Sequence, residues 1–248
     1  MAFLFYFAKR ISPIKLKMKT LILISTVFIF FTLTSFNKQK GLSALEIGKG
    51  LKDALLQGTS KSSDQLSAVD GFFGNAAIKI LFPPQAQKAE QTLRTIGLNK
   101  LCDDIILSLN RAAEDAAKQA KPIFVKAIKK MTLKDVTDIL LGSPDAATQY
   151  FKRTTSADLS VSFKPVIQGS LSKTNATKFY GDAAEQYNRI PFVRKMNPDI
   201  SDYVTQKALD GLFYQIAAEE LNIRKNIGAR PSPLLQKVFS FADKNMKP

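Results

Sequence analysis

The sequence predicts an all-α fold: a single multi-helix domain of about seven to nine helices behind an N-terminal signal or anchor segment. Apolar residues recur at intervals of three and four along most of the chain after residue 41. Glycines, prolines, and Ser or Thr residues followed by acids stand where helices of ordinary length begin or end. No run of alternating β-branched residues is long enough for a strand, and the chain has no glycine-rich phosphate loop and no internal repeat.

The first element is residues 18–36, which read MKTLILISTVFIFFTLTSF. Basic residues ahead of an apolar run are typical of a secretory signal, so we expect a signal peptide or signal anchor within residues 1–36, with the true start at Met18. Both fates stay open. The run is about long enough to cross a bilayer, whereas Leu33 weakens the cleavage signal after Ser35. Either fate predicts an exported protein of the periplasm or cell envelope, anchored in the membrane if the segment is retained.

Residues 37–41 form a linker, and residues 42–248 form the helical domain. The expected helices of this domain cover residues 42–57, 85–96, 99 to about 119, a segment opened by Pro122, 132–141, a segment opened by Ser143, 156–171, 175–189, 201–227 and a final helix opened by Ser232 and Pro233.

Glycine and proline set the boundaries in the first half of the domain. Gly58 ends the first helix as a C-cap, and residues 59–63 form a loop. Residues 69–82, VDGFFGNAAIKILF, mix glycine and phenylalanine ahead of two prolines, which predicts a buried turn and a short helix. Gly97 ends the next helix.

Capping residues set the boundaries in the second half. Thr132 precedes Asp135 by three residues, which predicts a capping box. Ser143 is the expected N-cap of a helix that restarts directly after Gly142, and Ser156 is the expected cap of another. Residues 190–198 form a Pro-containing connector.

Composition limits the chemistry. The whole chain carries a net charge of +15, and without residues 1–36 there remain 31 Lys and Arg against 21 Asp and Glu, a net +10. A basic protein favours an anionic partner such as membrane headgroups or acidic glycans, and export argues against nucleic acid. Because the basic residues are interleaved with acids, a solvated surface is the simpler interpretation. No feature specifies an oligomeric state.

The single cysteine and the absence of histidine exclude several kinds of covalent and catalytic chemistry. Cys102 has no partner for an intramolecular disulfide, and its apolar neighbours at helical spacing predict a buried thiol. Without histidine there is no Ser-His or Cys-His dyad and no imidazole metal ligand. We therefore expect no cofactor, no metal and no catalytic residue of the familiar hydrolase kinds.

Polar residues on two of the predicted helices are the candidate ligand-binding residues. On the helix from residue 99, the apolar face is followed by polar rows that contain Asn110, Arg111 and Glu114. Such rows fit a surface ion-pair network or a groove for a partner, and both interpretations remain open. In DAATQYFKRTT, residues 145–155, Gln149 and Arg153 stand beside aromatic residues, an arrangement that suits an anion or a sugar, or a core aromatic with cations around it.

The helix from residue 201 adds two candidates. Glu219 falls on its apolar stripe, so its carboxylate needs a partner, and we expect Arg111 or Arg153 from another helix. Arg224 follows Glu220 by four residues, the favourable spacing for an ion pair on one turn.

Several long segments resemble the bacterial domain of unknown function 4197 family (DUF4197). They are GLKDALLQG from Gly50, DGFFGN from Asp70, LNRAAEDA from Leu109, DAATQYFKRTT from Asp145, and YVTQKALDGLF from Tyr203 followed by IAAEE and IR. The resemblance covers nearly all of the chain after Leu42. It implies an exported helical envelope protein, and it implies no activity, substrate or cofactor.

Three functions compete. The first is a non-catalytic binding or interaction module of the envelope, with a polar groove between helices. The second is a carboxylate-based hydrolase acting on glycans, with Asp103, Glu114 and Glu219 as its acids, which requires two carboxylates across a cleft. The third is a peripheral protein bound to anionic lipid, which requires lysines clustered on one side.

Overall fold

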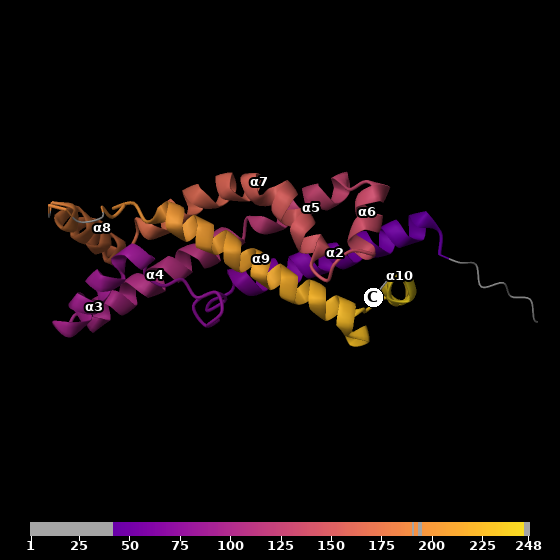
Figure 1. Ribbon diagram of the computed structural model, residues 1–248, viewed down its shortest axis with the longest axis horizontal. Coiled ribbons are helices and arrows are strands. Elements are labelled where there is room, and N and C mark those ends of the chain that lie inside the picture. The colour runs from indigo at the N-terminus through magenta and orange to yellow at the C-terminus, as the bar shows by residue number, and fades with distance from the viewer. Residues whose placement is uncertain (1–41, 190, 193–194, 246–248) are drawn as a thin grey trace, which may run out of the picture. The chain divides into compact units, whose positions relative to one another are not determined.

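The computed structural model describes residues 42–189, 191–192 and 195–245, and over this part of the chain it is all-α, as predicted (Figure 1). Its elements are α2 (Ala44–Ser67), η1 (Pro84–Ala86), α3 (Gln87–Thr95), α4 (Asn99–Ala117), α5 (Ala120–Lys130), α6 (Leu133–Leu140), α7 (Ala146–Leu171), α8 (Asn175–Asn188), α9 (Ser201–Lys225), η2 (Ile227–Ala229) and α10 (Pro233–Asn245). The predicted signal or anchor, the linker and part of the 190–198 connector lie outside the described residues.

The long helices α2, α4, α7 and α9 pack against one another and form the core. Four phenylalanines are fully buried among them: Phe72, Phe124, Phe151 and Phe163. Phe124 meets Phe151 edge to face with ring centroids 5.1 Å apart, a favourable aromatic geometry. Cys102 is buried, as predicted, and this burial raises the pKa of its thiol.

Two local signals place helix ends correctly. Thr132 and Asp135 form the predicted capping box, with the Thr132 Oγ1 atom accepting from the Asp135 N–H at 3.1 Å. Gly97 ends α3 with a φ of +87°, a conformation that favours glycine. These ends depend on residues a few positions apart, so the sequence alone determines them.

The predicted helix end at Gly58 is wrong, and so is the loop over residues 59–63, because α2 continues to Ser67. Gly58 is buried against α9, where its Cα faces Ile223 and Glu219. The hydroxyls of Thr59 and Ser63 donate to carbonyls one turn earlier, at 2.7 and 2.8 Å, so their polar groups are satisfied within the helix. Packing against α9 therefore outweighs the local preference of glycine for a helix end.

The predicted helix starts at Ser143 and Ser156 are also wrong. A single helix, α7, begins at Ala146 and passes through Ser156, whose hydroxyl donates to the Lys152 carbonyl at 2.6 Å. Residues 69–82 form turns and irregular backbone, with buried Phe72 and Ile80, and contain no helix.

Candidate functional site

Asn110 of α4 holds the backbone of the segment before η1. Its Oδ1 atom accepts from the Ile80 N–H at 2.9 Å, and its Nδ2 atom donates to the Ile80 carbonyl at 2.8 Å and to the Ile106 carbonyl at 2.7 Å. The side chain is fully buried. Asn110 therefore satisfies both backbone polar groups of Ile80, which lies outside regular secondary structure.

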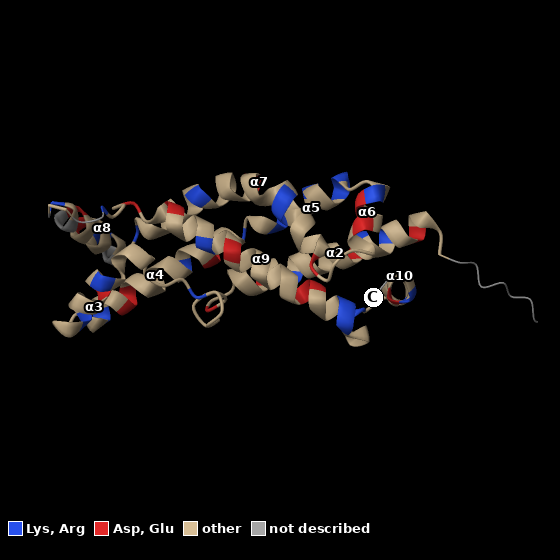
Figure 2. Ribbon diagram, in the orientation of Figure 1, with Lys and Arg blue, Asp and Glu red and all other residues tan. Residues whose placement is uncertain are grey.

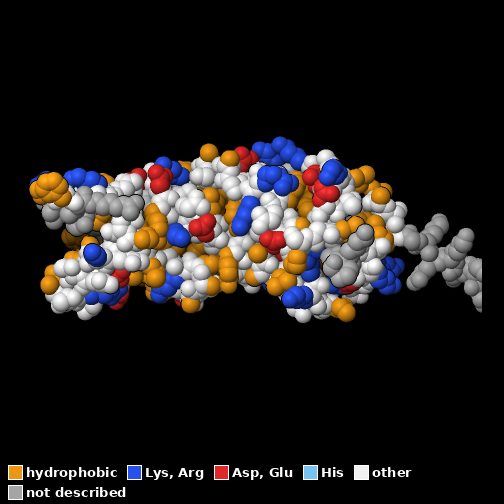
Figure 3. All heavy atoms as spheres, in the orientation of Figure 1, with side chains coloured by type: hydrophobic (Ala, Val, Ile, Leu, Met, Phe, Trp, Pro, Cys, Tyr) orange, Lys and Arg blue, Asp and Glu red, His pale blue; other side chains and the backbone are white. Residues whose placement is uncertain are grey.

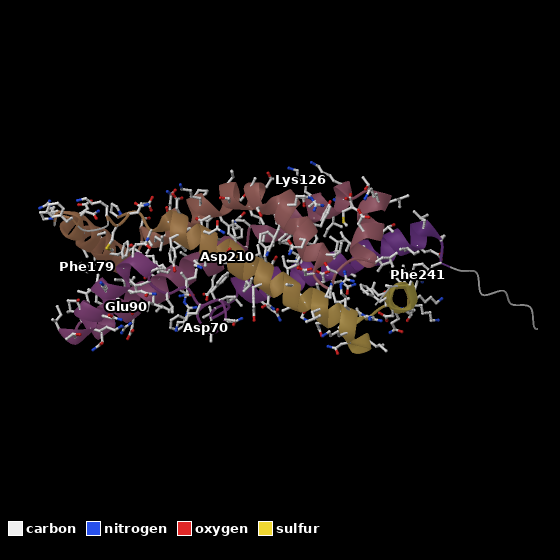
Figure 4. The ribbon with its side chains drawn as sticks, in the orientation of Figure 1. Asp70, Glu90, Lys126, Phe179, Asp210 and Phe241 are labelled. Carbon is white, nitrogen blue, oxygen red and sulfur yellow. The ribbon has the colours of Figure 1, made fainter. Side chains whose placement is uncertain are left out.

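One turn further along α4, Glu114 holds the start of the same segment. Its buried carboxylate accepts from the backbone N–H groups of Phe72 and Phe73 at 3.1 and 3.2 Å. Arg111 donates to Glu114 at 2.6 Å and to Asp70 at 2.8 Å, and Figure 4 labels Asp70 in this loop. The hydrogen bond with Glu114, and then that with Asp70, raise the pKa of Arg111. Three predicted candidates thus come together, and all three fix the 70–80 loop to α4.

Residue 71 has to be glycine because the loop lies very close to the backbone at the end of α2. A Cβ atom on Gly71 would lie 2.6 Å from the Leu66 carbonyl oxygen, closer than real Cβ atoms come to backbone. Asp70 itself has a φ of +67°. The loop therefore turns back against the end of α2 with no room for a side chain at Gly71.

Between this held segment and α9 lies a surface groove of about 390 Å³. It is lined by Ala77, Ile78, Lys79, Leu81, Phe82, Pro84, Gln87, Tyr203, Lys207, Asp210, Gly211 and Tyr214. We call it the tyrosine groove, after Tyr203 and Tyr214 of α9. The Tyr203 hydroxyl donates to the Leu81 carbonyl at 3.1 Å, and burial raises the pKa of Tyr203. This bond ties the two walls of the groove together.

The groove combines apolar walls with cations at its rim. Tyr214 is 51% exposed, and Leu81 is also exposed. The Lys79 ammonium lies 3.8 Å from the centroid of the Phe73 ring, and Lys207 pairs loosely with Asp210 at 3.7 Å. Figure 4 labels Asp210 on α9. The chemistry of the tyrosine groove suits a ligand with an apolar part and a negative charge.

Glu220 and Arg224 form the predicted ion pair, at 2.8 Å, but inside the protein. Glu220 accepts from the N–H groups of Ala147 and Thr148, both at 2.9 Å, at the start of α7. Arg224 donates to the Ile139 carbonyl at 2.8 Å, at the end of α6. The acid thus caps a helix N-terminus and the base caps a helix C-terminus, each matching the local dipole. The pair is a clamp on the α6–α7 corner.

Glu219 lies next to this clamp but has a different partner from the one predicted. The Lys61 ammonium donates to both oxygens of its carboxylate, at 2.9 Å to Oε1 and 2.8 Å to Oε2. The expected pairing of Glu219 with Arg111 or Arg153 is therefore wrong. Lys61 belongs to the segment that was predicted to be a loop, and only its placement on α2 brings it to Glu219. Lys61 and Glu219 line a polar groove of about 500 Å³ together with Asn222 and Asn226.

Gln149 and Arg153 are exposed on α7. Gln149 donates to Asp145 at 2.8 Å, and the Arg153 guanidinium lies 5.6 Å from the centroid of the Tyr150 ring. The seven predicted candidates therefore fall into separate groups, at the 70–80 loop, at the α6–α7 corner, in the Lys61 groove and on the surface of α7.

The three acids considered for a hydrolase each have a basic partner. Asp103 pairs with Arg94 at 2.9 Å, Glu114 with Arg111, and Glu219 with Lys61. In the described part of the chain, no group of three or more His, Cys, Asp or Glu residues is arranged to hold a metal ion. None of the described helices combines the length and apolarity needed to cross a membrane.

The residues of the tyrosine groove are not among the candidates that the sequence pattern predicts. One signal was present for the α9 wall, because Tyr203 and Asp210 stand in YVTQKALDGLF, a segment that carries the family resemblance. Only the fold shows that this segment of α9 faces residues 77–84 across one groove.

No curated protein and no solved structure matches the chain. The family described as protein of unknown function (DUF4197) matches residues 41–240, which is most of the chain. The protein belongs to the DUF4197 family.

Proposed function

We propose that the protein is an exported, non-catalytic binding module of the cell envelope, and that its ligand is a small anionic molecule with an apolar part. The tyrosine groove is the observation that carries this proposal. Its volume of about 390 Å³ falls in the usual range for small-molecule sites. Its rim offers Lys79, which has no carboxylate within ion-pair distance among the described residues, and its wall offers the exposed ring of Tyr214.

The architecture around the groove supports a preformed site. Asn110 and Glu114 fix one wall to α4, and Tyr203 fixes that wall to α9. Groups held in this way lose little conformational entropy when a ligand binds. The paired state of Asp103, Glu114 and Glu219 favours binding over carboxylate catalysis, which needs an unpaired acid beside a second carboxylate.

Export rests on residues 18–36 of the sequence, and it sets the compartment in which the ligand is found. Cell fractionation and N-terminal sequencing test this part directly. A cytoplasmic protein that begins at Met1 or Met18 would overturn the proposed location and leave the groove unaffected.

The binding proposal is tested on protein isolated from its native envelope. Native mass spectrometry of this protein should show a copurifying anionic species, and Tyr214→Ala or Lys79→Gln should reduce its occupancy severalfold. Tyr214→Phe keeps the ring, and Lys244→Gln removes an exposed charge from α10, so both controls should retain the ligand. Decanoate, with decanol as the neutral counterpart, supplies an independent probe in a titration followed by tyrosine fluorescence. Equal responses to the two molecules, or an unchanged response in Tyr214→Ala, would refute the groove as an anion site.

A further inference from the structure

The strongest run of one charge in the domain lies on and around α5. Between Asp115 and Asp135 the sequence contains six lysines and no acid. Three of them, Lys126, Lys129 and Lys130, are exposed on one side of α5, while Phe124 and Ile128 on the other side are buried. We call these three residues the lysine face. An amphipathic helix with lysines as its whole polar side is typical of a surface that meets anions.

The neighbouring ion pairs leave much of this charge free. Lys126 has only a long pair with Asp158, at 3.7 Å. Lys129 and Lys130 have no carboxylate within 4.0 Å in the described part of the chain, whereas Lys134 and Lys121 are paired with Asp138 and Asp64. Figures 2 and 3 show Lys and Arg residues along the same edge over α5, the start of α6 and α7, and Figure 4 labels Lys126 there.

Exposed leucines lie beside the lysine face. Leu133, which opens α6, is 62% exposed, and its Cδ2 atom would be 3.7 Å from a Cβ atom on Gly48 of α2. Leu45, one turn before Gly48, is 79% exposed. The acid nearest to Leu133 in the sequence is Asp135. Its carboxylate accepts hydrogen bonds from the backbone N–H and the hydroxyl of Thr132, and these bonds lower the pKa of Asp135. Lysines around exposed leucines match a lipid surface, where charge meets headgroups and leucine enters the acyl boundary.

The short segment between the apolar run and α2 also favours contact of this surface with a membrane. The apolar run ends at Phe36, and the seven residues 37–43 that join it to α2 can extend to at most about 25 Å. If the run stays in a bilayer as an anchor, the start of α2, with Leu45, is within that distance of the membrane. Helix α6 packs against α2, so Leu133 lies close to Gly48, one turn after Leu45.

We infer that the lysine face, with Leu133 and Leu45, docks the domain onto a bilayer that contains anionic lipid. This surface is separate from the tyrosine groove and does not depend on the ligand proposed there. Each lysine near an anionic surface is worth roughly a fivefold change in the docking equilibrium, so the three together contribute roughly a hundredfold. High salt weakens the docking, because it screens these charges.

The test uses the full chain in nanodiscs of phosphatidylcholine, with or without phosphatidylglycerol, and amine labelling read by mass spectrometry. Phosphatidylglycerol should lower the labelling of Lys126, Lys129 and Lys130 severalfold, and high salt should restore it. The exposed lysines Lys88, Lys173 and Lys178, on α3, after α7 and on α8, should label equally in both lipids. Equal labelling of the lysine face in both lipids would overturn the inference, and so would protection of both sets of lysines.

A pair of triple variants then tests whether the lysines cause the docking. Lys134 follows Leu133 on α6, so docking should also lower its labelling in the discs that contain phosphatidylglycerol. Replacing Lys126, Lys129 and Lys130 by Gln should abolish this protection of Lys134. Replacing Lys88, Lys173 and Lys178 by Gln changes the net charge equally and should leave that protection intact. Far-ultraviolet circular dichroism confirms that both variants are folded. Protection that persists in the first variant, or that occurs with phosphatidylcholine alone, refutes recognition of anionic lipid.

Discussion

The clamp at the α6–α7 corner gives the sharpest stability prediction, for Glu220→Gln. The Glu220 side chain is 6% exposed and the Arg224 side chain 9%, so both charges are removed from water. The carboxylate accepts five hydrogen bonds, from two backbone N–H groups, from the Thr148 hydroxyl and from the Nε and Nη2 atoms of Arg224. An amide has one acceptor oxygen and presents an NH₂ group to a donor, so at least one N–H loses its partner and Arg224 remains as a buried unpaired charge.

Removing one partner of a buried ion pair costs about 3 to 5 kcal/mol. We expect Glu220→Gln to fall within this range, since the shape of the side chain is kept and no cavity forms. The free energy of unfolding is measured by urea denaturation, with the midpoint and slope followed by circular dichroism. Arg224→Met combined with Glu220→Gln should cost less than the sum of the two single changes, because the pair is then removed together.

Glu219→Gln is the matched control, one position earlier on the same helix. Its partner Lys61 is 50% exposed, so solvent screens the pair, and the loss should be no more than about 1 kcal/mol. If Glu219→Gln cost as much as Glu220→Gln, the clamp would have no special role, and the argument from burial would be refuted.

Asn110→Ala leaves the Ile80 N–H and carbonyl without partners in a buried place, so we expect a loss of about 2 to 4 kcal/mol and faster proteolysis within residues 70–82, read by limited digestion. Gly71→Ala should destabilise the protein by several kcal/mol in urea denaturation, because its Cβ meets backbone, whereas Gly169→Ala, in an exposed stretch of α7 with nothing within 4 Å of its Cβ, should stabilise it by up to about 1 kcal/mol. Burial raises the pKa of Tyr180 to about 12, above its unfolded value of 10, so the neutral form is favoured in the folded state and stability falls as pH rises above 10. The urea midpoint of Tyr180→Phe should therefore fall less than that of the wild type between pH 9 and 11; parallel curves would contradict this assignment.

The sequence determines the helical class because class depends on local periodicity, and it determines the Thr132 cap because its two residues are three positions apart. At Gly58 and Ser156 the local sequence predicts a helix boundary that the structure does not have. Gly58 looks like a helix end until Ile223 and Glu219 are seen to cover it, and the Ser156 hydroxyl bonds within its own helix. The outcome at Gly58 is decided by neighbours distant in the sequence, whereas Ser156 is a capping residue type that continues a helix by bonding to the carbonyl one turn earlier.

For the candidate residues too, the sequence predicts which way a side chain faces but not the residue that it contacts. A helical wheel places Glu219 toward the interior, and the structure confirms its burial, but a wheel gives a direction and not a neighbour, so Lys61 was missed. Likewise, Asn110 and Glu114 were found as polar residues on a largely apolar helix. Their partners are backbone groups of residues 72–80, which a search for complementary side chains does not reveal.

Residues that support the tyrosine groove and residues at its open side should respond differently to mutation. Asn110 and Glu114 hold one wall of the tyrosine groove from behind, so their replacement should weaken binding and stability together. Tyr214 and Lys79 lie at its open side and hold no backbone segment, so their replacement should weaken binding while the free energy of unfolding stays nearly unchanged. A loss of function at Asn110 alone therefore says nothing about the ligand. Only variants that separate the two quantities identify the residues that touch it.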